Sequence, residues 1–280
     1  MRRYALAGRT VALTGSTGGL GSALAEALRT RGANVALMDL DLEAAREQAR
    51  RLGGGLLARA YGVDVRDLGM LEQAMAAAAS DFGRLDVAIA NAGVEVMSPM
   101  ALMDPAEFER TIDVNLNGVW RTYRAALPHV AKTRGYLLGI SSMAAFVHSP
   151  LQAPYTASKA GVWAMSDSIR LEVRHLGVDV GTIHPTFFRT PMMDRVLEDA
   201  AGRMLWGGQE RVPWKMVEQD TVVDGVVGAI ERRAPMTVIP KANTGIARAP
   251  GLFRPLVDRF GWRKDQIPRA IDLVARRDDR

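Results

Sequence analysis

The fold class is decided by the stretch Val-Ala-Leu-Thr-Gly-Ser-Thr-Gly-Gly-Leu-Gly at residues 11–21. Its first residues form a short apolar run that is typical of a buried strand, and the residues that follow predict a helix over 20–31. Glycine is favoured between the two because side chains would keep backbone N–H groups away from a phosphate. The partial positive charge of the helix N-terminus attracts the same group. An ordinary tight turn would also account for the glycines, so their position must be weighed with the rest of the chain.

Strand-like and helix-like segments alternate along the chain. Apolar runs predict strands at 11–14, 35–38, 56–63, 87–90, 136–140, 178–183 and 237–239. Segments rich in Ala, Leu, Glu and Arg predict helices at 20–31, 41–52, 67–82, 105–132 and 154–176, and a further helix is expected at 216–232. Strands separated by helices imply parallel pairing, and continuous apolar runs imply that both faces of the sheet are covered. We therefore expect an α/β fold with a doubly wound parallel sheet of Rossmann type.

The regular alternation ends after residue 190. Residues 191–214 hold three Met, two Trp and several Gly and show no clear period. Further on, apolar residues recur at helical spacing between Leu252 and Phe260. We expect one Rossmann-fold domain over residues 1–245 and a basic, amphipathic helical tail over 246–280.

The positive charge of the chain is mostly a property of the tail. The formal net charge is +5, and residues 242–280 carry nine Lys or Arg against five Asp, which leaves +1 for the rest. No recognised nucleic-acid-binding motif accompanies these charges, so we expect no nucleic-acid partner. The tail is expected to pack on the protein, at a subunit interface or over a substrate pocket. Contact with an anionic membrane surface is a minor alternative.

Several kinds of site are disfavoured by composition. The chain has no Cys, which excludes disulfides and thiolate metal sites and suits a reducing cytoplasm. Its four His are not spaced like a pair of metal ligands, so no metal site is expected. No apolar run is long enough to span a membrane. We expect a cytoplasmic protein.

Asp39 stands at the end of the second predicted strand, 18 residues after Gly21. A carboxylate there can accept hydrogen bonds from both hydroxyls of an adenosine ribose and would repel a 2′-phosphate. No Lys or Arg stands at Gly18 or Leu40 to neutralise such a phosphate. The sequence therefore favours NAD(H) over NADP(H). The alternative role for Asp39, as a helix N-cap, is less favoured because Asp41 is available for it.

Tyr155 and Lys159 stand at positions i and i+4 of a predicted helix and so share one face. A free phenol, with a pKa of about 10, is a slow acid–base catalyst at neutral pH. A nearby ammonium favours the phenolate and lowers that pKa. The spacing by itself is common, and a surface pair on an amphipathic helix would explain it equally well.

Other motifs in register with this pair resolve the question. Across residues 8–240 the sequence resembles the classical short-chain dehydrogenase/reductase family. The motifs that carry this resemblance are Thr14–Gly21, Asp64-Val65, Asn91-Ala92-Gly93, Val114-Asn115-Leu116-Asn117-Gly118, Ser141-Ser142, Tyr155–Lys159 and Pro185–Thr190. Ser142 precedes Tyr155 by 13 residues, which is the family's usual separation and selects Ser142 over Ser141.

The resemblance implies a catalytic set of four residues. Tyr155 would be the general acid/base that exchanges a proton with the substrate oxygen, and Ser142 would hydrogen-bond that oxygen. Lys159 would lower the pKa of Tyr155 and hold the nicotinamide ribose. Asn115 would anchor the water that passes protons to Lys159.

The resemblance also implies a cofactor site for NAD. Asp64 would lie beside the adenine, the Asn91–Gly93 segment would form a wall against the cofactor, and Phe188 and Thr190 would fix the carboxamide. The expected cofactor-binding residues are Gly15, Ser16, Thr17, Gly19, Leu20, Gly21, Asp39, Leu40, Asp64, Val65, Asn91, Ala92, Gly93, Tyr155, Lys159, Pro185, Phe188 and Thr190.

Two features depart from the family pattern. Pro185-Thr186 replaces the usual Pro-Gly, so Thr must tolerate the local backbone geometry. The glycines also fit two spacings, that of the classical branch and that of the extended, epimerase-like branch. The Asn-Ala-Gly segment and the short chain after Tyr155 favour the classical branch.

The residues that usually line the substrate pocket in this family are apolar here. They are Met143, Phe146 and Val147 after Ser142, and Met192, Met193, Trp206 and Trp214 in a substrate loop over about 191–214. We therefore expect a bulky apolar secondary alcohol or ketone, such as a steroid-like, terpenoid or long acyl compound. The alternative is that several of these side chains are core.

The sequence thus predicts an NAD(H)-dependent oxidoreductase that works as a homodimer or homotetramer. A cofactor-binding sensor or scaffold without catalysis is one alternative, because a fold does not by itself confer activity. An NADP-dependent ketoreductase is another. The presence of Ser, Tyr and Lys together favours an enzyme.

Overall fold

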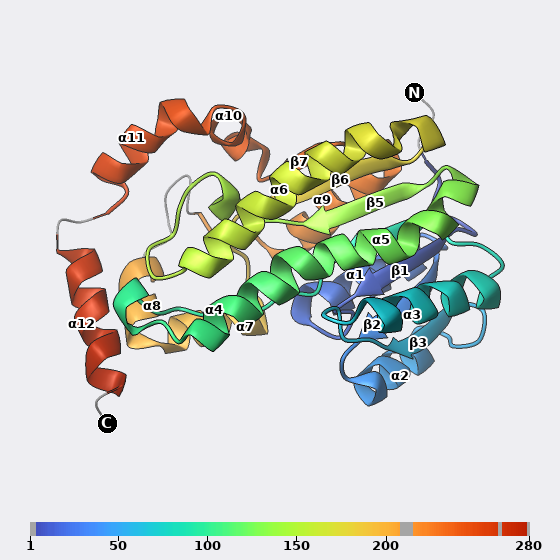
Figure 1. The fold of residues 1–280 in the computed structure, drawn as a ribbon, viewed down its shortest axis with the longest axis horizontal. Coiled ribbons are helices and arrows are strands. Elements are labelled where there is room, and N and C mark those ends of the chain that lie inside the picture. The colour runs from blue at the N-terminus through green and yellow to red at the C-terminus, as the bar shows by residue number, and fades with distance from the viewer. Residues whose placement is uncertain (1–3, 208–214, 263–264, 279–280) are drawn as a thin grey trace.

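The centre of the molecule is a parallel β-sheet (Figure 1). The computed structural model describes residues 4–207, 215–262 and 265–278. Within these residues the sheet has seven strands, in the order β3-β2-β1-β4-β5-β6-β7, and every neighbouring pair is parallel. The strands are β1 (Thr10–Thr14), β2 (Asn34–Asp39), β3 (Ala58–Gly62), β4 (Val87–Ala90), β5 (Tyr136–Ile140), β6 (Asp179–Pro185) and β7 (Met236–Ile239). The expected Rossmann-type fold is confirmed.

Helices cover both faces of the sheet (Figure 1). One face carries α1 (Gly19–Thr30), α2 (Leu42–Arg51) and α9 (Gln219–Arg232), and the other carries α3 (Leu68–Asp81), α5 (Gly118–Val130) and α6 (Ala153–Val173). The central strands are buried along their whole length, as their continuous apolar runs predict. Burying one Leu or Val side chain contributes roughly 1.5–3 kcal/mol.

The chain reverses its direction of winding between β1 and β4. These two strands are neighbours in the sheet although two further strands separate them in the sequence. The loops that leave their carboxyl ends therefore diverge and open a crevice. The glycine-rich turn follows β1, and the Asn91–Gly93 segment follows β4.

The helix predicted over 105–132 is divided in the structure. It consists of α4 (Pro105–Ile112), a π-helical turn (Asp113–Asn117) and α5. The segment 191–214, expected to be irregular, contains the short helices α7 (Pro191–Glu198) and α8 (Ala200–Trp206). Residues 208–214 lie outside the described residues.

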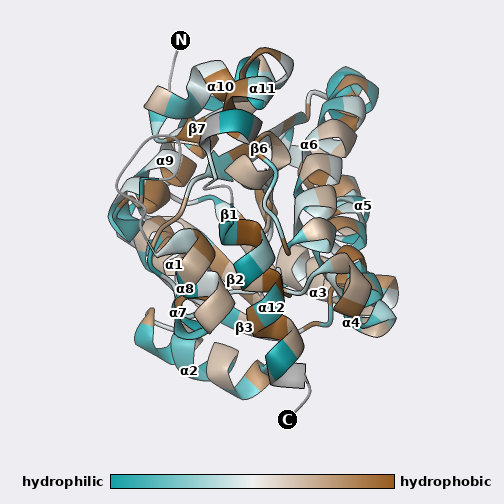
Figure 2. Cartoon of the chain, turned by 90° about the vertical axis from the view of Figure 1, so that its left-hand side faces the viewer, coloured by the Kyte–Doolittle hydropathy of each residue, from teal (hydrophilic) through white to brown (hydrophobic). Residues whose placement is uncertain are grey.

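The helical spacing noted between Leu252 and Phe260 lies in one of three helices formed by the described residues from 244 to 278. They are α10 (Thr244–Arg248), α11 (Pro250–Phe260) and α12 (Gln266–Asp278). Ala270 and Val274 on α12 are buried in the cluster that includes α8, whereas Leu252 and Leu256 on α11 are exposed. Figure 2 shows apolar and polar residues mixed along both helices. Among the described residues no helix has both the length and the apolar character needed to cross a bilayer.

Candidate active site

A cavity of about 670 Å³ lies where the carboxyl ends of the strands meet the helices. It extends from the glycine-rich turn after β1 to the first turns of α6 and α7. Nearly all of the predicted site residues line it, and two do not. Ser16 is fully buried beneath the turn, where its carbonyl accepts a 2.8 Å hydrogen bond from Gln48 Nε2. Asn115 is fully buried behind the wall of the cavity.

The glycine-rich turn has no room for a side chain at Gly19 or Gly21. A Cβ atom at Gly21 would lie 2.0 Å from the carbonyl oxygen of Gly15, and one at Gly19 would lie 2.8 Å from Pro191 Cδ. No side chain caps the N-terminus of α1, so its first N–H groups remain available at the cavity. This arrangement fits the pyrophosphate of a dinucleotide.

Asp39 faces the glycine-rich turn from the end of β2. Its Oδ2 accepts a 2.8 Å hydrogen bond from the backbone N–H of Thr17, and the side chain lines the cavity. The neighbouring Asp41 caps α2 by accepting from Ala44 N at 3.0 Å. The structure thus gives the capping role to Asp41, as expected, and leaves Asp39 at the cavity.

Asp64 and Val65 line the same end of the cavity. Asp64 forms a 2.6 Å ion pair with Arg66, and that guanidinium holds the pKa of the carboxyl below its usual value. Arg66 also lines the cavity and was not predicted.

The π-helical turn brings Asn115 to the segment after β4. Its Oδ1 accepts a hydrogen bond from Val94 N at 2.8 Å, and its Nδ2 donates to Val94 O at 2.8 Å. Nδ2 also lies 3.3 Å from Ser158 Oγ on α6. The side chain of Asn115 therefore ties the cavity wall to α6.

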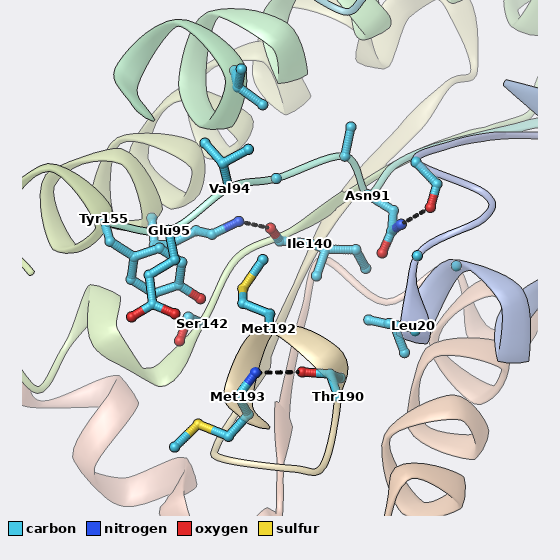
Figure 3. Close-up of a pocket in the computed structure, with 18 of the residues that line it drawn as sticks. Leu20, Asn91, Val94, Glu95, Ile140, Ser142, Tyr155, Thr190, Met192 and Met193 are labelled. Carbon is cyan, nitrogen blue, oxygen red and sulfur yellow. Dashed lines mark hydrogen bonds between the residues drawn. The ribbon is translucent and has the colours of Figure 1, made fainter. Parts of the chain in front are cut away.

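Tyr155 and Ser142 lie close together at one end of the cavity (Figure 3), and Lys159 lines the same cavity. Tyr155 and Ser142 are joined by a side-chain hydrogen bond. Lys159 Nζ donates to the carbonyl of Ile140 at 2.9 Å and lies 5.5 Å from the centre of the Tyr155 ring. Lys159 is almost completely buried, and burial lowers its pKa to about 8.

The expectation that the pKa of Tyr155 lies below its ordinary value is wrong for this structure. Burial, followed by the charge of Glu95, raises the pKa of Tyr155 to about 12, and only the hydrogen bond with Ser142 lowers it. Burial disfavours the charged form of both the phenol and the ammonium. The Lys159 ammonium, itself shifted towards neutrality, is not enough to reverse this.

His184 on β6 supports the loop that carries Ser142. Its Nδ1 lies 3.3 Å from the carbonyl of Ser142, and its Nε2 lies 2.9 Å from Thr182 Oγ1. Burial lowers its pKa to about 4, so the imidazole is neutral at physiological pH. The residue does not line the cavity and has a structural role.

The segment after β6 closes the cavity over the glycine-rich turn. Thr190 caps α7 by accepting from Met193 N at 3.1 Å, and Pro185 and Phe188 line the cavity with it. Thr186, which replaces the family's usual Gly, is not among the residues with a left-handed backbone, and its N–H donates to Ile239 O at 2.8 Å. Threonine therefore fits this position without backbone strain.

The expected substrate-binding residues are only partly brought together. Met143, Val147, Met192 and Met193 line the cavity. Two others are core: Phe146 packs against Trp163 and His184, and Trp206 packs against Phe187 and Trp262. Trp214 lies outside the described residues.

Two lining residues near Tyr155 were missed by the sequence reasoning. Glu95 lies two residues after Gly93, and Gln152 lies three residues before Tyr155. Burial raises the pKa of Glu95 to about 7. Both residues stand close to recognised motifs, which could have marked them as lining the site. Nothing in the sequence indicates that two residues so far apart form a pair.

Comparisons with known proteins agree with this geometry. Residues 9–201 match the family model described as short chain dehydrogenase. The chain is 37% identical over 202 residues to 3beta-hydroxysteroid dehydrogenase 1 of Eggerthella lenta, covering 71% of this chain and 77% of the relative. It is 32% identical over 204 residues to D-threitol dehydrogenase of Mycolicibacterium smegmatis, covering 72% of this chain and 78% of the relative.

A solved structure shares the fold. A short-chain type dehydrogenase/reductase from Mycobacterium marinum superposes with a TM-score of 0.74 at 24% identity, over 84% of this chain and 94% of the other. The chain belongs to the classical short-chain dehydrogenase/reductase family. It is an oxidoreductase that acts on alcohol or ketone groups of small molecules with a nicotinamide cofactor.

Proposed function

We propose that this enzyme interconverts a bulky, largely apolar secondary alcohol and its ketone, with NAD(H) as cofactor and Tyr155 as general acid/base. The proposal rests on the observation that two groups of residues with different chemistry line opposite ends of one cavity. The glycine-rich turn and Asp39 line one end, and Tyr155, Ser142 and Lys159 meet at the other. Such a cavity suits a dinucleotide that brings its reactive ring to the proton-transfer group.

The residues that would hold the cofactor follow the length of the cavity. The first N–H groups of α1 would bind the pyrophosphate, and Asp39 would accept hydrogen bonds from the adenosine ribose. Asp64 and Val65 would lie beside the adenine, and Thr190 beside the nicotinamide carboxamide. When bound, NAD would be the oxidant and would accept a hydride from the alcohol carbon.

Proton transfer is assigned to Tyr155, Ser142 and the buried Lys159. Ser142 would hydrogen-bond the substrate oxygen, and Tyr155 would take or return its proton. Lys159 would donate hydrogen bonds to the cofactor ribose and, as a cation, would favour the phenolate. Asn115 would act by holding the segment at Val94 in place, since both ends of its amide are engaged there.

The proposed preference for an apolar substrate rests on the lining beside Tyr155. Met143, Val147 and Met192 present apolar surface there, with Phe187 from the loop after β6. A relative that is 37% identical is named a 3beta-hydroxysteroid dehydrogenase, which supports a bulky alicyclic alcohol. The relative named D-threitol dehydrogenase supports a polar substituent as well.

We further propose that the enzyme is a cytoplasmic homo-oligomer. Phe108 on α4 and Trp120 on α5 are exposed aromatic residues whose burial by a second copy would remove apolar surface from water. The absence of Cys suits a reducing compartment.

The test of the proposed function is an initial-rate screen of secondary alcohols with NAD and with NADP, together with the variant Asp39→Asn. We expect turnover with NAD, and a rise of about tenfold or more in the NADP-to-NAD ratio of kcat/KM for Asp39→Asn, because the charge that repels a 2′-phosphate is removed. Asp41→Asn, a neighbouring helix cap, is the matched control and should leave the ratio unchanged. Better turnover by the wild-type enzyme with NADP would contradict the proposal.

A further inference from the structure

Glu95 is a carboxylate inside the cavity that the proposed mechanism does not use. It leaves the end of β4 two residues after Gly93 and lines the cavity. Its carboxylate points towards Tyr155 and Ser142 (Figure 3). Its charge acts on Tyr155 and contributes to the raised pKa of that phenol.

The side-chain amide of Gln152 orients the carboxylate of Glu95. Gln152 Nε2 donates a hydrogen bond to Glu95 Oε1, and the Gln152 side chain is itself buried. Gln152 precedes α6 but its side chain does not cap that helix. The preceding Leu151 has a φ of 63°, a left-handed conformation that is rare for Leu, and its carbonyl accepts from Ser98 N at 2.8 Å. The amide that orients Glu95 is thus held on a constrained backbone.

Among the described residues, no Lys or Arg forms an ion pair with the remaining acceptor positions of Glu95. An ionised carboxylate offers about four acceptor sites, and the amide of Gln152 occupies one. Arg195 on α7 lines the same cavity and lowers the pKa of Glu95 by its charge, but its side chain is exposed to solvent and forms no ion pair with Glu95. A charged group removed from water is costly unless it is hydrogen-bonded. A ligand that supplies a donor is therefore favoured at this place, and one that brings a second negative charge is disfavoured.

We propose that Glu95 is a specificity-determining residue that accepts a hydrogen bond from a second hydroxyl group on the carbon next to the reacting carbon. The second hydroxyl must be on the neighbouring carbon because the carboxylate lies beside Tyr155 and Ser142. This inference rests on the proposed function, in which those two residues hold the reacting oxygen. The preferred substrate is then a largely apolar vicinal diol or the matching α-hydroxy ketone. A 2-hydroxy acid, with a carboxylate at the same place, is rejected.

The same contact also assists proton transfer. The charge of Glu95 is one cause of the raised pKa of Tyr155. A substrate hydroxyl that donates to Glu95 partly offsets this charge and so favours the phenolate that accepts the alcohol proton. Binding of the second hydroxyl and activation of Tyr155 are therefore linked.

The test uses three probes that differ only in the substituent on the carbinol carbon. 1-Phenylethane-1,2-diol carries CH₂OH, 1-phenylethanol carries CH₃ and mandelate carries a carboxylate. Each is measured for kcat/KM with NAD at about pH 8.5, where Glu95 is ionised. Each is also titrated into the complex with reduced cofactor by calorimetry, which needs no turnover.

We expect the wild-type enzyme to favour the diol over 1-phenylethanol by about tenfold or more and to reject mandelate. Glu95→Gln should reduce this preference by about tenfold and improve binding of mandelate. Gln152→Met should act in the same direction, because the carboxylate loses its orienting amide. Glu198→Gln, which alters an exposed carboxylate on α7, is the matched control and should change neither ratio.

Equal binding of the diol and 1-phenylethanol, an unchanged preference in Glu95→Gln, or no binding of any probe would overturn the role of Glu95. Turnover of simple alcohols together with such a result would leave the proposed function standing. The predicted order of binding without any turnover would contradict the proposed function alone.

Discussion

Tyr155 and Glu95 share one small region of the cavity, and the charge of Glu95 disfavours the charged state of Tyr155. Burial raises the pKa of both groups, and the charge of Glu95 raises that of Tyr155 further. Lys159 is held by the carbonyl of Ile140. Tyr155, the proposed proton-transfer group, therefore has three polar neighbours, and the sequence motif includes only two of them, Ser142 and Lys159.

The raised pKa of Glu95 has a consequence for stability. The folded protein holds this proton more tightly than the unfolded chain, since the pKa rises from 4.5 to about 7. Stability from this group is fully present below about pH 4.5 and is lost as the pH rises to about 7. We expect Glu95→Gln, which does not titrate, to gain about 1–2 kcal/mol in free energy of unfolding over wild type between pH 5 and pH 8.5.

Urea unfolding of both proteins at the two pH values measures this gain. Glu198→Gln is the control, because it shows how the loss of an exposed carboxylate changes the free energy of unfolding. A difference between Glu95→Gln and wild type that does not change with pH would contradict the burial of a charge at this site.

At this scale the sequence predicts only residues that belong to motifs. Tyr155 and Lys159 stand one turn apart on one helix, Ser142 and Asp39 belong to motifs of recognisable spacing, and the structure places all four at the cavity. Glu95 was missed because its partner, Gln152, is 57 residues away and meets it only through the fold.

The packing of α1 against its preceding turn requires that residue 21 have no Cβ atom. At Gly21, which is in the first turn of α1, a methyl group would meet the carbonyl oxygen of Gly15 at 2.0 Å. We expect Gly21→Ala to weaken NAD binding by roughly a hundredfold and to lower stability by about 2 kcal/mol or more, because backbone must move.

Gly245→Ala is the matched control for this prediction. Gly245 is in the first turn of α10, and nothing lies within 4 Å of its added Cβ. This variant should keep full NAD binding and gain up to about 1 kcal/mol in stability. Calorimetric titration with NAD and urea unfolding measure both effects. Equal NAD affinities for the two variants would show that the turn does not bind the pyrophosphate.

The strands were predictable from their short, continuous apolar runs, and most helices from their length and composition. The division of the helix at 105–132 was not, because the π turn there serves a tertiary contact between Asn115 and Val94. The helices α7 and α8 were missed because each has only eight residues or fewer. Their start signals, Thr190 before Pro191 and Asp199, were present in the sequence.

For the molecule as a whole, the tail is joined to the cavity through one apolar cluster. Val274 on α12 is 2% exposed and belongs to the same cluster as Trp206 on α8 and Met193, which lines the cavity. Net charge and apolar spacing predicted an amphipathic tail. They did not predict where it packs, because that depends on the position of α8.

We expect Val274→Asp to disturb this cluster and to raise the substrate KM by roughly fivefold or more, while the KM for NAD stays unchanged. Ile271→Asp, on the exposed side of the same helix, is the matched control and should change neither constant. The result is read from steady-state kinetics with each substrate varied in turn. An equal effect of both variants, or a change in the KM for NAD, would contradict the proposed link between tail and substrate end.

The role of Tyr155 in proton transfer can be measured by comparing Tyr155→Phe with wild type in NAD reduction followed by absorbance. Tyr123→Phe is the control, since this buried tyrosine lies 3.3 Å from Ser166 and does not line the cavity. We expect Tyr155→Phe to lose about a hundredfold or more in kcat but still to bind NAD, while Tyr123→Phe remains active. Turnover by Tyr155→Phe equal to that of wild type would contradict this role.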